Sequence, residues 1–92
     1  MLPYWSVNPI IRPSALKHGL TDVDIRHALE FAIYMGNILP EPPIRRIILG
    51  PAPSGLLLEV VVLVLDDGRA LVIHAMKMRR SYAKYLEGRA NG

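Results

Sequence analysis

The strongest constraint on the fold is a pair of apolar segments joined by a short polar turn. Residues Leu56–Leu65 form a ten-residue apolar run that is broken only by Glu59, and four of the five positions from 60 to 64 are valine. Valine favours extended structure, and a continuous apolar run is typical of a strand buried on both faces. After the turn Asp66–Arg69 the chain continues with the mostly apolar segment Ala70–Met76. Because the turn contains Asp-Gly, the usual signal of a tight hairpin, we expect two long antiparallel strands.

The register of this hairpin determines which polar side chains share a face. If Asp67 and Gly68 form a two-residue turn, the facing pairs are Asp66 with Arg69, Val62 with Ile73, Val61 with His74, and Glu59 with Met76. Since side chains alternate between faces, Glu59 and His74 then lie diagonally on one face, about 7 Å apart at the backbone, and Lys77 points to the opposite face. A carboxylate beside an imidazole either satisfies itself at the sheet surface or orients the imidazole for proton transfer.

The rest of the chain predicts helices on either side of the strands. A helical turn is expected over 14–19, and a longer helix begins after the N-cap Thr21, with apolar residues in helical spacing up to Ile33, and ends at Gly36-Asn37. The proline-rich segment 39–43 is expected to be a stiff connector, and Ile44–Leu49 a strand. The turn 50–55 leads into the hairpin, and the last helix is expected over Arg80–Glu87.

These elements predict one α+β domain over residues 1–92. Its order is N-terminal helices, an antiparallel meander of three or more strands, and a C-terminal helix, with the helices on one face of the sheet. Three prolines in residues 1–13 allow at most an extended arm or a short edge strand there, so the core is expected over 14–87. A chain of 92 residues has room for one modest core.

Charge is concentrated at the C-terminal end. The chain carries a net charge of +3, but residues 69–92 hold six basic residues and one acidic residue, whereas residues 1–68 hold five basic and seven acidic residues. A basic segment on a nearly neutral body is typical of a surface that contacts a polyanion, although a solvated, solubilising helix has the same composition. We keep both interpretations open.

Composition excludes several classes of protein. Without cysteine the chain can form no disulfide scaffold, thiol nucleophile or thiolate metal site. The longest apolar run is far shorter than the roughly 20 residues of a membrane helix, so we expect no membrane contact and a cytoplasmic location. His18, His27 and His74 lack the spacing of a metal site, and two prolines in Gly50–Gly55 remove amide donors that would cradle phosphate. We expect no metal and no cofactor.

The run Met76–Arg80 (MKMRR) is the main cluster of candidate ligand-binding residues. Arginine at a helix N-terminus is unfavourable because its charge opposes the helix dipole. The placement of Arg79 and Arg80 at the expected start of the last helix therefore suggests that they bind another group, such as a phosphate. Arg45 and Arg46 point to opposite faces of the neighbouring strand, so only one of them can join that site. Tyr82 and Tyr85 either stack on bases or fill the seam between helix and sheet.

Several short motifs lie along the chain: Lys17-His18-Gly19 before a helix that contains Ala28-Leu29, an apolar strand that ends at Gly50, the run Gly55–Val62, an Asp-Gly turn and Val72–Ala75. These motifs resemble those of toxins of the BrnT type, which belong to the RelE-like group of small ribonucleases. Together they span about residues 14–87. The chain is similar in particular to a sub-group of short actinobacterial proteins with the pattern HG, DIRHAL, LLEVVV and VIHAM. Where typical members have R-I-I-S-A-R-K, this chain has Leu71–Lys77, so the two family arginines fall on Leu71 and Met76.

The resemblance implies the toxin component of a type II toxin–antitoxin system that acts as a metal-independent endoribonuclease. Its implied partners are an RNA substrate and a cognate antitoxin protein, in a homodimer or a toxin–antitoxin hetero-oligomer. The expected catalytic residues are His74 as acid or base, Lys77 as a charge-stabilising group, and Arg79 and Arg80 on phosphate. Arg46, Glu59 and Tyr82 are expected to bind substrate. The alternative is a catalytically inactive module of the same fold that binds RNA or a protein.

Overall fold

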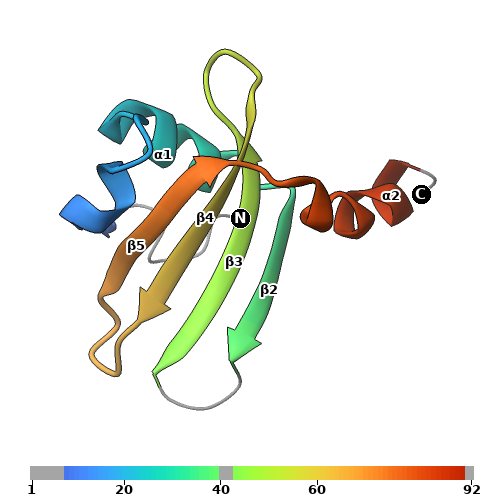
Figure 1. The fold of residues 1–92 in the computed structure, drawn as a ribbon. Helices are drawn as coiled ribbons and strands as arrows, with labels where there is room; N and C mark the ends of the chain where they lie inside the picture. The colour runs from blue at the N-terminus through green and yellow to red at the C-terminus, as the bar shows by residue number, and fades with distance from the viewer. Residues whose placement is uncertain (1–7, 40–42, 91–92) are drawn as a thin grey trace.

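A five-stranded mixed sheet forms the centre of the computed structural model, which describes residues 8–39 and 43–90. The strands are β1 (Ile10–Ile11), β2 (Tyr34–Leu39), β3 (Ile44–Pro51), β4 (Leu57–Val64) and β5 (Ala70–Lys77). They lie in the order β1-β5-β4-β3-β2, and all neighbours are antiparallel except β1, which pairs in parallel with β5 (Figure 1). The helical elements are η2 (Pro13–Leu16), α1 (Asp22–Glu30), η3 (Arg80–Tyr82) and α2 (Lys84–Ala90).

The expected arrangement of N-terminal helices, antiparallel meander and C-terminal helix is wrong. Strand β2 was missing from it and takes the place of the end of the long N-terminal helix. The short edge strand allowed within residues 1–13 is present as β1, but it pairs in parallel with β5, so the sheet is mixed and not an antiparallel meander. Helix α1 ends at Glu30, where the backbone N–H of Phe31 donates to the carbonyl of His27 at 3.0 Å. Residues 1–7 of the expected arm and 40–42 of the expected connector lie outside the described residues.

Pairing with β3 explains why the chain leaves the helix so early. Ala32 and Ile33 continue the helical spacing, but the backbone N–H of Ile33 donates to the carbonyl of Leu49 at 2.8 Å. From Tyr34 onward each residue then pairs along β3, with one irregularity between Asn37 and Leu39. A ladder with a long neighbouring strand satisfies the backbone of this segment, so a non-local interaction overrides the local helical pattern.

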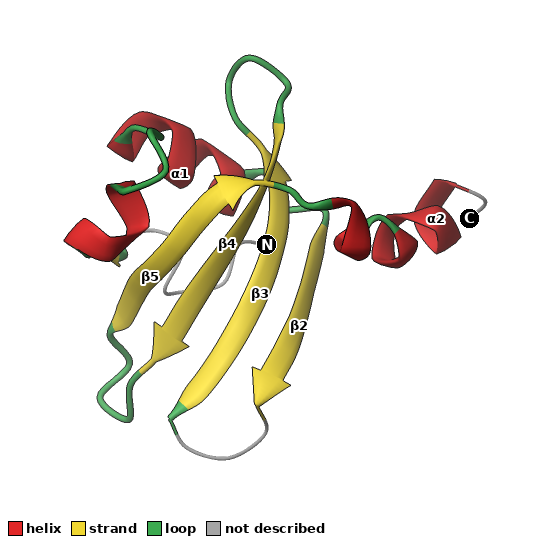
Figure 2. Cartoon of the chain, viewed as in Figure 1, coloured by secondary structure: helices red, strands yellow, loops and turns green. Residues whose placement is uncertain are grey.

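Helix α1 covers one face of the sheet over β3 and β4 and forms the core (Figure 2). It begins with a capping box between Thr21 and Asp24, as the expected N-cap requires. The side chains that it shares with the sheet are fully or almost fully buried: Ile25, Ala28, Leu29, Ile48, Leu58, Val60, Val62, Val72 and Ala75. At Gly50 the helix comes so close that a Cβ atom would collide with the backbone carbonyl of Ala28.

The β4–β5 hairpin has a longer loop than the expected two-residue turn. The backbone N–H of Leu65 donates to the carbonyl of Arg69 at 2.9 Å, so residues 66–68 form a three-residue loop, with Gly68 at φ 89°. Asp66 therefore does not face Arg69, and Val62 faces Val72 rather than Ile73. Gly at the left-handed position of a three-residue loop is the common geometry for such a hairpin.

The C-terminal α-helix begins and ends later than expected and does not cover the sheet. The segment expected to be helical over Arg80–Glu87 begins as the 3-10 turn η3 and continues as α2. Figure 1 shows α2 projecting beyond the β2 edge, away from α1. The ring of Tyr85 in α2 stacks on Tyr34 of β2 with centroids 5.0 Å apart. None of the helices in the described part of the chain has the length and apolar character to cross a membrane.

Candidate functional site

A β-bulge at Ile73 places His74 on the sheet face opposite α1. The register set by the loop, continued along the hairpin, would put His74 opposite Val60, whose side chain points into the core under α1. The extra residue Ile73 shifts the pairing by one, so that His74 faces Val61 and Glu59 faces Met76. The predicted sharing of a face by Glu59 and His74 is therefore confirmed. Bulges often re-aim side chains in this way beside functional sites.

Glu59 is the centre of a hydrogen-bonded cluster on this face. Its side chain is completely buried, and it is the one buried charged residue among those whose burial the structure describes, residues 8–38 and 43–87. Oε1 accepts from the backbone N–H of Arg79 at 2.9 Å and from Arg79 Nε at 3.0 Å. Oε2 accepts from Arg79 Nη2 at 2.8 Å and from His74 Nε2 at 3.1 Å. Each carboxylate oxygen thus has two donors, which is the compensation that a buried charge requires.

The surroundings of Glu59 keep it ionised. Burial alone raises the pKa of a carboxyl group, but the hydrogen bonds from the side chain and backbone of Arg79, then the bond from His74 and the charge of Arg79, outweigh burial. The net pKa of Glu59 therefore lies below its ordinary value of 4.5. At neutral pH this carboxylate is an acceptor only.

An ionised Glu59 fixes the tautomer of His74. Because Oε2 can only accept, His74 Nε2 carries a proton and donates it. In the neutral imidazole the other ring nitrogen, Nδ1, then has a free lone pair. The His74 side chain is 25% exposed, so the cluster presents an oriented imidazole at the protein surface. This is the arrangement that a histidine needs in order to accept a proton from a bound substrate.

Arg79 and Tyr82 extend the cluster toward the C-terminal helix. The Arg79 guanidinium binds Glu59 with one side and remains 57% exposed, and its Cζ atom lies 5.8 Å from the centre of the Tyr82 ring. Tyr82 lies in turn 6.1 Å from Tyr85, centroid to centroid. Arg80 is exposed, and its side chain makes no hydrogen bond or ion pair with the described residues. Arg79 is therefore held in place by a buried carboxylate, which the sequence does not indicate.

Two of the expected site residues lie on the other face of the sheet. Lys77 pairs with Leu58, and Arg46 pairs with Val62, and both partners are core residues on the α1 side. Lys77 is exposed at the end of β5. Arg46 directs Nη1 toward the sulfur of Met35 at 3.8 Å, and its Nε atom is buried without a partner in the part of the chain that the structure describes. The structure thus brings His74, Glu59, Arg79 and Tyr82 together but separates them from Lys77 and Arg46.

His18 is a neighbour of His74, although the sequence placed it only in the Lys17-His18-Gly19 motif and among the rejected metal ligands. The two rings meet edge to face, with centroids 5.5 Å apart and an angle of 76° between their planes. The segment β1–η2 brings His18 there by lying along the edge of β5. No local pattern predicts this contact, because it depends on the parallel pairing of β1 with β5.

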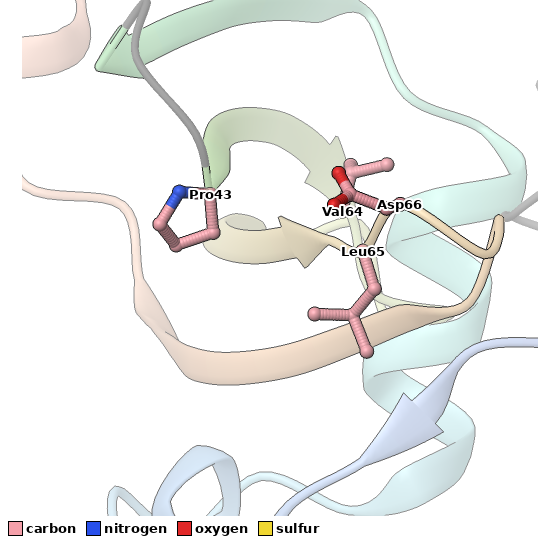
Figure 3. Close-up of a pocket in the computed structure, with 4 residues that line it drawn as sticks. All are labelled: Pro43, Val64, Leu65 and Asp66. Atoms are coloured by element: carbon pink, nitrogen blue, oxygen red, sulfur yellow. The ribbon is translucent and has the colours of Figure 1, made fainter.

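A surface hollow lies at the other end of the sheet. Pro43, Val64, Leu65 and Asp66 line it, next to the β4–β5 turn (Figure 3). Val64 and Glu59 are at opposite ends of β4, about 16 Å apart at the strand rise. The hollow is therefore separate from the Glu59 cluster, and Asp66 is the one ionisable side chain among the described residues that line it.

Neither a metal site nor a relative adds to this description. Within residues 8–39 and 43–90, no group of three or more His, Asp or Glu side chains is arranged to hold a metal ion. Comparison of the chain with protein-family models, with curated proteins and with solved structures finds no match. The candidate site therefore rests on the geometry of the Glu59 cluster.

Proposed function

We propose that this chain is a metal-independent endoribonuclease that acts as the toxin of a toxin–antitoxin pair, with the Glu59 cluster as its active site. The observation that carries the proposal is the buried carboxylate of Glu59, which binds His74 at 3.1 Å and Arg79 at 2.8–3.0 Å on one face of the sheet. In RNA cleavage of this kind the ribose 2′-hydroxyl attacks the adjacent phosphate. The reaction needs a base that takes the hydroxyl proton and a cation that stabilises the phosphate charge, and an oriented imidazole beside a fixed guanidinium can supply both. The toxin role, the antitoxin partner and the cytoplasmic location rest on the motifs that resemble BrnT-type toxins.

In the proposed reaction His74 begins the cleavage. Its Nδ1 atom takes the proton of a ribose 2′-hydroxyl while the 2′-oxygen attacks the adjacent phosphorus. Glu59 stabilises the imidazolium that forms, as a carboxylate behind a catalytic histidine does in hydrolases. The exposed side of Arg79 and the free side chain of Arg80 bind the phosphate oxygens, whose negative charge increases in the transition state. Tyr82 stacks on a flanking base.

Cleavage of a labelled single-stranded RNA in the presence of a chelator tests the proposal. The purified chain should cut the RNA and leave DNA of the same sequence intact, because DNA lacks the 2′-hydroxyl. His74→Gln should be slower by about 10²–10⁴. Expression of the chain without an antitoxin should slow bacterial growth, and expression of His74→Gln should not. Intact RNA after incubation with folded protein would contradict the enzymatic proposal.

The second candidate is a binding module without catalytic activity. This candidate is favoured because Lys77 and Arg46 lie on the face opposite His74. The Glu59 cluster therefore has fewer basic side chains to bind phosphate than the sequence predicts. In that case the cluster mainly fixes Arg79 and the C-terminal segment, and the basic residues bind RNA. RNA binding that weakens with increasing salt, without any cut product, would favour this candidate.

A further inference from the structure

The most informative contact outside the roles assigned above is that between His18 and His74. The His18 ring approaches the His74 ring with centroids 5.5 Å apart, and the two planes are nearly perpendicular. His18 is exposed and His74 is partly exposed, so both imidazoles are open to the same region of the surface. Two imidazoles at this distance can contact the same phosphodiester group.

The segment that carries His18 is anchored directly beside His74. Strand β1 pairs in parallel with the first residues of β5, and the backbone N–H of Arg12 donates to the carbonyl of Val72 at 3.0 Å. The Ser14 hydroxyl donates to the carbonyl of Ile73, the bulged residue, at 2.7 Å. Gly19 at φ 86° turns the chain away immediately after His18. The histidine pair is thus held through the same bulge that aims His74.

Cleavage of RNA requires two proton transfers, and His74, as the base, performs only the first of them. When the 2′-oxygen attacks, the bond from phosphorus to the 5′-oxygen breaks, and that oxygen needs a proton to leave. The neighbours of His74 do not supply it readily: Glu59 is ionised and buried, and Arg79 retains its proton, because its bonds to Glu59 raise its pKa. A histidine can be protonated or neutral near pH 7, which suits this task.

We propose that His18 is the general acid that protonates the leaving 5′-oxygen, so that His18 and His74 form a two-histidine active site. The inference rests on the proposed ribonuclease function and specifies its mechanism. His74 Nδ1 removes the 2′-hydroxyl proton, the new bond from the 2′-oxygen to phosphorus forms, and the bond to the 5′-oxygen breaks as His18 donates its proton there. The products are a 2′,3′-cyclic phosphate and a 5′-hydroxyl end, so no water or other reactant is consumed.

A substrate with a sulfur atom in place of the bridging 5′-oxygen tests this assignment. A thiolate leaves without protonation, so the substrate bypasses a general acid but still requires a general base. On ordinary RNA, His18→Gln and His74→Gln should each be slower than the unmodified protein by about 10² or more. On the sulfur-substituted RNA, His18→Gln should recover to within about tenfold of the unmodified protein, whereas His74→Gln should remain slow.

His27→Gln is the matched control for histidine removal. His27 lies on α1, on the other side of the sheet, and its Nδ1 atom contacts the carbonyl of Pro51 at 2.7 Å. This variant should cut both substrates at the rate of the unmodified protein.

The outcomes separate this inference from the function on which it rests. If the folded, unmodified protein cuts neither substrate, both proposals fail. If it cuts RNA and His18→Gln cuts at the same rate, His18 is not the acid and only the present inference fails. A loss in His18→Gln that the sulfur substrate does not restore would assign His18 a structural role and would also overturn the inference.

Discussion

Replacing Glu59 with glutamine should destabilise the fold more than any other change of a single charged side chain on the sheet. Glutamine keeps the shape of the side chain, but one acceptor oxygen becomes an NH2 donor. In place of Oε2 this group would face Arg79 Nη2 and His74 Nε2, and in place of Oε1 it would face the backbone N–H and Nε of Arg79. Two hydrogen bonds are lost when the NH2 group replaces Oε1. When it replaces Oε2, the bond from Arg79 Nη2 is lost, whereas His74 can change tautomer and accept through Nε2.

The structure gives the expected size of the effect. A hydrogen bond to a charged group contributes about 1.5–3 kcal/mol to stability. Arg79 and His74 are 57% and 25% exposed, so water replaces part of what they lose, and the lower end of that range applies. The loss of one or two such bonds then lowers the free energy of unfolding by about 1.5–3 kcal/mol. For a 92-residue chain this corresponds to a fall in Tm of roughly 6–24 °C.

Thermal unfolding at pH 7, followed by circular dichroism, measures the effect. Glu30→Gln is the matched control, because Glu30 is exposed at the end of α1 and should change stability by no more than about 0.5 kcal/mol. If Glu59→Gln unfolded within a few degrees of the unmodified protein, Glu59 would not be the anchor of the cluster, and the argument that it orients His74 would lose its basis.

The lowered pKa of Glu59 also predicts how the difference in stability between the unmodified protein and Glu59→Gln depends on pH. The pKa of Glu59 is lower in the folded chain than its ordinary value of 4.5, so the folded state keeps the carboxylate charged where the unfolded state binds a proton. Its contribution to stability is fully present above pH 4.5 and is lost as pH falls through the lower pKa of the folded state. The difference in Tm between the unmodified protein and Glu59→Gln should therefore narrow below pH 4.5. A difference that stays constant down to strongly acidic pH would contradict this reasoning.

Three further substitutions test the packing around the site. Gly50→Ala should destabilise the fold by about 1–3 kcal/mol, because its Cβ would collide with the Ala28 carbonyl, and an unchanged Tm would contradict the close approach of α1. Ser14→Ala should cost about 1 kcal/mol through the hydrogen bond lost at the bulge, measured by denaturant unfolding. Tyr85→Ala should speed amide hydrogen exchange in α2, since the stack on Tyr34 is lost, and unchanged exchange would show that the stack does not hold α2.

The pairing of Glu59 with His74 was predicted correctly, although two local features of the hairpin were missed. The expected two-residue turn is a three-residue loop, which shifts the register by one position, and the bulge at Ile73 shifts it back. Loop length is uncertain in sequence because Asp-Gly suits both geometries. The bulge has no local signal, because the Ser14 contact that accompanies it comes from a distant part of the chain.

The other errors also have non-local causes. The helical spacing that runs through Ile33 is present in the sequence, yet pairing with β3 decides that the segment from Tyr34 is a strand. Alternation correctly placed Lys77 on the face opposite His74, so its expected catalytic role conflicted with the predicted geometry. The hydrogen bonds between Arg79 and Glu59 depend on how the chain turns after β5. In the sequence, a basic residue that binds a buried carboxylate looks the same as one that is exposed to solvent.

The most direct test of the proposed site compares the cleavage of one oligoribonucleotide by the unmodified protein, His74→Gln and Lys77→Ala under single-turnover conditions with a chelator. Both residues are on β5, but they point to opposite faces. His74→Gln should be slower by about 10²–10⁴, and Lys77→Ala should stay within about twofold of the unmodified rate. Equal rates for His74→Gln and the unmodified protein, or a larger loss in Lys77→Ala than in His74→Gln, would contradict the assignment of the Glu59 cluster as the active site.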